Sequence, residues 1–197
     1  MKTEKYSTSF TVGGGLVNES VLFAEHYFEI GDWQNVRDLV EEKNLLQART
    51  KATLGRLCRE IVSRLKLLAD DELKLLLEGS HLDRSQVLWL GICKRHHFVR
   101  DFAIEVVREK FLKMQPDLLM EDYDAFYDSK AEWHPELERL GHATRLKLRR
   151  TTFQMMRDTG IIDNDHKILA TVMSPSALGT IRQHSAEYLS VFPMANT

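Results

Sequence analysis

The chain has few of the residues that hold a small secreted domain together. Its 197 residues include two cysteines and four prolines. Cys58 and Cys93 are far apart and form no CxxC pair, which excludes a disulfide framework and favours a reducing compartment. A chain of this length buries roughly two-thirds of its unfolded surface. It therefore needs neither disulfides nor a structural metal to fold.

The sequence also lacks an apolar segment long enough for a signal peptide or a membrane span. Residues 1–15 are polar and then glycine-rich, without an apolar core. In the C-terminal half, the longest stretch without Asp, Glu, Lys or Arg is Ile168–Ile181, and Ser174, Pro175 and Ser176 interrupt it. A spanning helix needs about 20 mostly apolar residues. We therefore expect a soluble, cytoplasmic protein without a membrane span.

The patterns of common catalytic and metal sites are absent as well. The eight histidines include the adjacent pair His96–His97, but no HExxH motif and no Cys/His cluster at zinc spacing. Gly13–Gly15 is not followed by the Lys and Ser or Thr of a P-loop. We interpret it as a flexible lead-in to the first helix, with a backbone anion contact as the alternative. The sequence predicts no enzyme, no cofactor and no metal.

Apolar residues recur at helical spacing through most of the chain, which predicts an all-α, compact multi-helix bundle. The exception is 161–173, where a turn-like Asp-Asn-Asp lies between apolar residues and predicts either a small β-hairpin or an extended arm. No repeat or linker is present, so we expect a single domain of residues 1–197, with 115–117 as the one candidate boundary. The predicted helices are approximately 18–30, 33–43, 50–68, 70–79, 83–92, 98–114, 120–130, 135–140, 143–159 and 175–192.

The net charge of −2 conceals two basic blocks and one acidic block. The first basic block, Arg49–Lys66, contains the single acid Glu60, and the second, Arg139–Arg157, contains none. The acidic block, residues 117–138, contains the single cation Lys130. Because ordinary surface helices mix the two signs, such segregation indicates surfaces that meet a charged partner.

At about 100° per residue, the first basic block forms a helix with an apolar face and an opposite cationic face. A cationic face of this kind is typical of proteins that bind nucleic-acid phosphates. Two other interpretations remain open: the face docks on the acidic block or on a partner protein, or it is simply solvated. The candidate phosphate contacts are Arg49, Lys51, Arg56, Arg59, Arg64 and Lys66.

In the second basic block, apolar and basic positions interleave around the helix instead of dividing into two faces. Such a helix is able to pack on two sides, with arginines emerging between its neighbours. It supports nucleic-acid binding only if it lies beside the first basic helix. Arg145, Arg149 and Arg150 are therefore candidates of second rank.

Several short segments are distinctive: GGLVNES at 14–20, NLLQART at 44–50, REKFL at 108–112 and, most of all, KAEWHPEL at 130–137. In these segments the chain resembles the BrxA family, the small helical component of BREX bacteriophage-exclusion systems. The resemblance runs from about Tyr6 to Phe192. It implies a helical fold similar to the NusB family, a role in phage defence beside other BREX proteins, and binding to double-stranded DNA. It supplies no catalytic residue and no set of DNA contacts.

The sequence and this resemblance together predict a non-enzymatic DNA-binding component of a BREX system that contacts duplex DNA mainly through phosphates. One alternative is an assembly or adaptor protein that binds other BREX components without touching DNA. Another is an RNA-binding module with a NusB-like fold.

Overall fold

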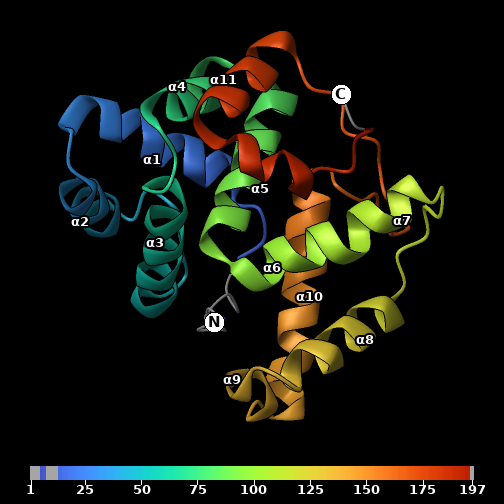
Figure 1. The fold of residues 1–197 in the computed structure, drawn as a ribbon. Helices are drawn as coiled ribbons and strands as arrows, with labels where there is room; N and C mark the ends of the chain where they lie inside the picture. The colour runs from blue at the N-terminus through green and yellow to red at the C-terminus, as the bar shows by residue number, and fades with distance from the viewer. Residues whose placement is uncertain (1–4, 8–12, 196–197) are drawn as a thin grey trace.

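The computed structural model describes residues 5–7 and 13–195, and the regular elements of these residues are helices (Figure 1). No β-strand forms within those two ranges, so the all-α prediction is confirmed. The α-helices are α1 (Val17–Ile30), α2 (Trp33–Lys43), α3 (Lys51–Leu65), α4 (Asp70–Glu78), α5 (His81–Arg95), α6 (His97–Phe102), α7 (Glu109–Leu112), α8 (Met120–Ala131), α9 (Pro135–Glu138), α10 (His142–Asp158) and α11 (Pro175–Ser185). The π-helical η1 (Ala103–Arg108) joins α6 to α7, and the 3-10 helix η2 (Ala186–Val191) follows α11.

Side chains at the helix ends determine several of these boundaries. The Asp32 side chain accepts a hydrogen bond from the backbone N–H of Asn35 at 2.8 Å, which caps the start of α2. Thr50 caps α3 in the same way through the N–H of Thr53. Gly31 ends α1 with a φ of 78°, a left-handed conformation that glycine adopts without strain. All three boundaries agree with the sequence prediction to within one residue.

Two predicted helix starts are wrong. We expected Asp83 to begin the fifth helix, but α5 begins at His81. Ser80, directly before His81, is the cap, and it forms a reciprocal capping box with Asp83 inside the first turn. We expected Asn18 to cap the first helix, whereas α1 begins at Val17 after Leu16. In both cases the acidic or amide residue lies inside the first turn of its helix.

Residues 161–173 contain no strand. A single antiparallel bridge joins Ile162 to Ile168 across the turn between them. The N–H of Asp163 donates to the carbonyl oxygen of Lys167 at 3.0 Å, and the N–H of Leu169 donates to that of Ile161 at 2.9 Å. Lys167 also forms a bridge with Asp117 from the loop between α7 and α8. The pairing ends after one bridge on each side, so the segment is a turn without the two strands of a hairpin, and residues 169–174 lack regular structure.

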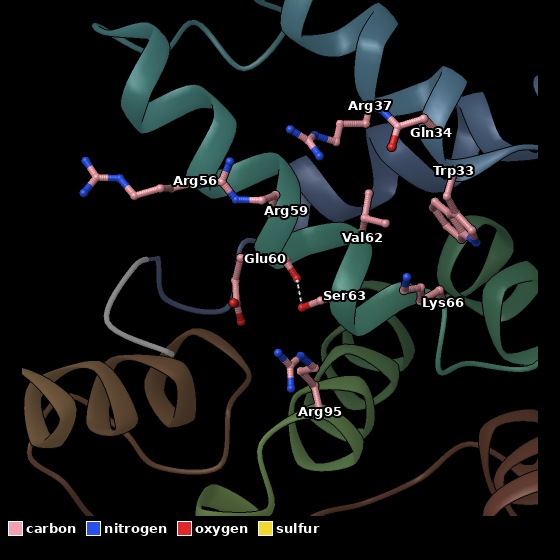
Figure 2. Close-up of a pocket in the computed structure, with 10 residues that line it drawn as sticks. All are labelled: Trp33, Gln34, Arg37, Arg56, Arg59, Glu60, Val62, Ser63, Lys66 and Arg95. Carbon is pink, nitrogen blue, oxygen red and sulfur yellow. Dashed lines mark hydrogen bonds between the residues drawn. The ribbon is translucent and has the colours of Figure 1, made fainter. Parts of the chain in front are cut away.

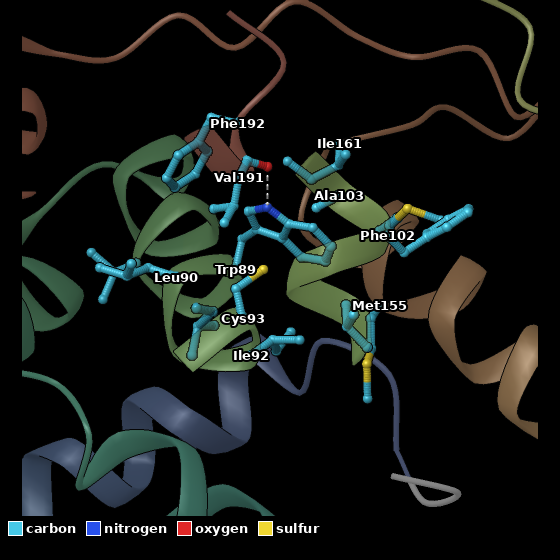
Figure 3. Packing of buried hydrophobic residues seen from close by; sticks show 14 of the residues in the cluster. Trp89, Leu90, Ile92, Cys93, Phe102, Ala103, Met155, Ile161, Val191 and Phe192 are labelled. Carbon is cyan, nitrogen blue, oxygen red and sulfur yellow. Dashed lines mark hydrogen bonds between the residues drawn. The ribbon is translucent and has the colours of Figure 1, made fainter. Parts of the chain in front are cut away.

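The core lies around α5, which is buried along most of its length (Figure 3). The Trp89 ring is fully enclosed, and its Nε1 donates a hydrogen bond to the carbonyl oxygen of Val191 at 2.9 Å. Phe102 and Met155 pack nearby from α6 and α10 (Figure 3). The buried apolar cluster contains residues from both sides of 115–117. This shared core supports a single domain, which stays a prediction.

The basic helix α3 packs against α1, α2 and α5 and lies at one side of the molecule (Figure 1). Its inner face therefore rests on the central helix and its outer face is open to a ligand. Of the helices in the described residues, none combines the length and the apolar character needed to cross a bilayer.

Candidate nucleic-acid interface

Helix α3 has the two faces that its sequence predicts. Leu54, Cys58, Ile61 and Leu65 are buried in the core. On the opposite side the charged ends of long cationic side chains reach solvent. The exposed cations are Arg49, just before the helix, and Lys51, Arg56, Arg59 and Lys66.

Arg64 does not belong to this exposed face, and the prediction that it contacts phosphate there is wrong. Its side chain is 1% exposed. Its Nε donates to Oε1 of Glu60 at 2.8 Å, and its Nη1 donates to the carbonyl oxygen of Gly14 at 3.0 Å. At about 100° per residue, Arg64 lies at the edge of the cationic arc, next to the apolar face. The side chain turns inward from this edge because acceptors are available there.

Glu60 is the centre of this buried network. Its Oε1 also lies 2.6 Å from Nε2 of His96, at the end of α5. Burial raises the pKa of Glu60, but the hydrogen bond with His96 and the charge of Arg64 outweigh it and lower the pKa to about 2. Burial lowers the pKa of His96, which favours its neutral form. The negative charge of Glu60 is therefore balanced inside the protein by Arg64.

The glycine segment before α1 is part of the same network. Gly14 and Gly15 are buried, and the backbone N–H of Gly15 donates to Oδ2 of Asp158 on α10 at 2.8 Å. A Cβ atom on Gly14 would lie 2.0 Å from the same carboxylate oxygen. The interpretation of 13–15 as a flexible lead-in is therefore wrong: residues 14–15 are held between Arg64 and Asp158.

A pocket of about 640 Å³ opens on the outer side of α3, between α2 and the end of α5 (Figure 2). Trp33 and Val62 form its apolar part. The rest of its lining is polar and mostly cationic, and Glu60 is its one acid. The cations come from three helices: Arg37 from α2, Arg56 and Arg59 from α3, Lys66 from the end of α3, and Arg95 from the end of α5.

These cations differ in how far they are already engaged. Arg37 Nε lies 2.5 Å from Oε1 of Glu41, one turn along α2. Arg56 Nε donates to the carbonyl oxygen of Ala52 at 3.2 Å, which leaves its charge without a carboxylate partner. The remaining three form no ion pair within the described residues, and they are Arg59, Lys66 and Arg95. The pocket therefore holds positive charge that the fold itself does not neutralise.

The BrxA family model matches residues 4–185. The chain belongs to the BrxA family. A protein named BREX protein BrxA from Escherichia coli O9:H4 (strain HS) is 26% identical over 168 residues, which cover 85% of this chain and 79% of the relative. A protein of the same name from Bacillus cereus (strain H3081.97) is 21% identical over 129 residues, which cover 66% of this chain and 64% of the relative.

A solved structure shares the fold of this family member. The crystal structure of an uncharacterized protein from Magnetospirillum magneticum superposes with a TM-score of 0.81 at 20% sequence identity. The match covers 98% of this chain and 100% of that one. This match does not involve a NusB protein, so the likeness to NusB stays a prediction.

The second basic block has a different environment from the first. Arg145 Nη1 lies 2.7 Å from Oδ1 of Asp128, and its guanidinium lies over the ring of Tyr127. Arg149 forms an ion pair with Asp124. These arginines join α10 to α8, so part of the acidic block is the internal partner of the second basic block. Arg150 is exposed on α10.

Two cations of the pocket, Arg37 and Arg95, were not predicted from the sequence. Arg37 belongs to α2, which carries charges of both signs, and Arg95 belongs to the largely apolar α5. Neither segment therefore has the excess of positive charge that marked the two basic blocks. Arg95 had a weak signal, since it ends α5 directly after Lys94. No group of three or more His, Cys, Asp or Glu side chains within residues 5–7 and 13–195 is arranged to hold a metal ion.

Proposed function

We propose that this chain is a non-enzymatic, DNA-binding component of a BREX phage-defence system, and that it contacts duplex DNA mainly through phosphates. The observation that carries the proposal is the cationic pocket on α3, whose one carboxylate is already balanced by a buried arginine (Figure 2). Membership of the BrxA family and the names of two relatives support the assignment to a BREX system.

The charge of the pocket supports a phosphate ligand for a physical reason. Duplex DNA holds condensed counterions, and arginine and lysine side chains that neutralise its phosphates release these ions, which favours binding. Arg59, Lys66 and Arg95 have no ion pair within the described residues and are available for such contacts. Contacts of this type position a protein on a duplex without reading its bases, so we expect weak sequence preference.

The structure changes the ranking of the predicted contacts. Arg56, Arg59 and Lys66 remain in first place and Arg95 joins them, whereas Arg37 lines the pocket but ranks below them because it is paired with Glu41. Arg49 and Lys51 extend the exposed cationic surface along the start of α3, outside the pocket. Arg145 and Arg149 move to the last place because their charges are engaged by α8. Arg150 keeps its second rank.

Fluorescence anisotropy with a labelled duplex tests the proposal. We expect binding at low salt, and we expect the double variant Arg56→Glu/Arg59→Glu to lose roughly tenfold in affinity or more for each reversed charge. The matched control is Arg139→Glu/Lys147→Glu, which makes the same change in charge at exposed positions outside the candidate contacts. The control should bind within about threefold of the unmodified protein.

Three results would overturn the proposal. The first is absence of duplex binding at low salt, and the second is unchanged binding by the Arg56/Arg59 variant. The third is more efficient competition by single-stranded RNA than by duplex DNA of equal length, which would assign the surface to RNA. Co-purification with other BREX proteins after nuclease treatment, together with no affinity for DNA, would assign it to protein assembly.

A further inference from the structure

We infer that the pocket on α3 binds a phosphate monoester, the terminal phosphate of a nucleotide or of a DNA strand, in preference to the internal phosphodiesters of a duplex. The inference rests on the proposed function in that it concerns the same pocket. It adds the chemical group that enters the pocket, which family membership and the charge of α3 do not specify.

The first argument is the shape of the site. The cations surround a hollow of about 640 Å³ whose walls come from α2, α3 and the end of α5 (Figure 2). Volumes of about 300–1,000 Å³ are typical of pockets that enclose a small ligand. An internal phosphodiester has a sugar on each side and lies on the convex surface of the duplex, so the continuing strand limits it to contacts with the cations at the rim of the pocket. A terminal phosphate has one free side and can enter.

The second argument is the amount of charge. A phosphate monoester carries about −1.5 to −2 charges at pH 7 and presents three acceptor oxygens, whereas each internal phosphate of DNA carries one negative charge. Arg59, Lys66 and Arg95 have no ion pair in the described parts of the chain. These cations come from two different helices and line the same pocket. Their arrangement therefore suits one compact dianion, such as a phosphate monoester, better than a row of singly charged internal phosphates.

The third argument is the apolar part of the lining. Trp33 stacks on Tyr27 with ring centroids 4.0 Å apart and planes 7° apart, which fixes its position beside the pocket. Val62 lies next to it on α3 (Figure 2). A free inorganic anion has no apolar surface to pack against these two side chains. The sugar or base that carries a terminal phosphate can pack on it, as bases do on aromatic side chains of nucleic-acid-binding proteins.

The test compares two duplexes of identical sequence, one with a phosphate on all four strand ends and one with hydroxyl groups there. We expect the phosphorylated duplex to bind about tenfold more tightly in an anisotropy titration at matched salt. We also expect deoxyadenosine monophosphate to displace it, and deoxyadenosine, which lacks the phosphate, to have no effect.

Variants locate the preference in the pocket. Lys66→Gln/Arg95→Gln removes two of the lining cations, and it should bind the two duplexes equally. The matched control, Arg49→Gln/Lys51→Gln, removes two exposed cations outside the pocket. It should weaken both duplexes by the same factor and keep the difference between them. Loss of the preference in the control variant would place it outside the pocket and overturn the inference.

The remaining outcomes separate this inference from the proposed function. Equal binding of the two duplexes by the unmodified protein would overturn the inference and leave DNA binding in place. Binding of deoxyadenosine monophosphate without binding of either duplex would overturn the proposed function and identify a free nucleotide as the source of the monoester. Absence of binding to all of these ligands would overturn both.

Discussion

The side chains of Arg64 and Glu60 form a buried ion pair, with Nε 2.8 Å from Oε1, inside the first basic block of the chain. This pair separates the cations of α3 into two groups with different roles. Arg64 holds the fold together by joining α3 to the glycine segment before α1. Arg56, Arg59 and Lys66 are exposed and available to a ligand. Substitutions in the two groups should therefore affect different measurements.

Replacement of Arg64 should lower the stability of the protein. Arg64→Leu leaves the Glu60 carboxylate buried without its cation, and breaking a buried pair in this way costs about 3–5 kcal/mol. Urea unfolding measures the change. The control Arg59→Leu, at an exposed position of the same helix, should stay within about 0.5 kcal/mol of the unmodified protein. Equal stability of the two variants would show that the pair does not support the fold.

Acid should destabilise the fold in two steps. Burial lowers the pKa of His96 below 6.5 in the folded protein, so the unfolded chain binds an extra proton, and stability falls as the pH drops below about 6.5. Burial raises the pKa of Glu60, but His96 and Arg64 outweigh it and lower the pKa from 4.5 to about 2. The contribution of Glu60 is therefore present above about pH 4.5 and is lost as the pH falls toward 2.

Urea unfolding at pH 8, 6, 5 and 4 checks both steps. His96→Gln removes the group that titrates in the upper step, so the variant should lose less stability between pH 8 and 5 than the unmodified protein loses. Glu60 still titrates in this variant, and the decline below pH 4.5 should persist. A stability that is constant from pH 8 to 5 in the unmodified protein would contradict a neutral, buried His96.

Glycine at position 14 should be required by packing. Gly14→Ala places a Cβ atom 2.0 Å from Oδ2 of Asp158, and overpacking of this kind costs about 1–3 kcal/mol. The matched control is Gly179→Ala, at an exposed position in α11 with no atom within 4 Å of the new Cβ. It should stabilise the protein by up to about 1 kcal/mol because alanine favours helix. Thermal unfolding of the two variants should therefore shift in opposite directions.

The sequence predicted the elements of the fold well wherever a local signal defines them. The helix boundaries next to Gly31, Asp32 and Thr50 agree with the predicted ranges, and in the structure these residues cap the helices. At 161–173, where a small β-hairpin or an extended arm was predicted, only the Ile162–Ile168 bridge forms across the turn, and Lys167 also pairs with Asp117, more than 40 residues earlier in the chain. A pattern within one segment carries no information about such a distant partner.

The candidate site was predicted only in part, because some of its contacts depend on segments that are distant in the sequence. The periodicity of α3 correctly separated its apolar side from Arg56, Arg59 and Lys66. It could not show that Arg64 turns inward, since the acceptors at Gly14 belong to a distant segment. It also could not bring Arg95 to the pocket, because that requires the packing of α5 against α3.

The salt dependence of duplex binding tests the central claim most directly. If each of the four pocket cations without a carboxylate partner in the described residues neutralises one phosphate, a plot of log K against log salt has a slope of about −3.6, at −0.9 for each phosphate. Arg59→Gln should make the slope shallower by about 0.9, and Arg149→Gln, whose charge is engaged by Asp124, should leave it unchanged. A slope near zero, or one that Arg59→Gln does not change, would contradict phosphate binding at α3.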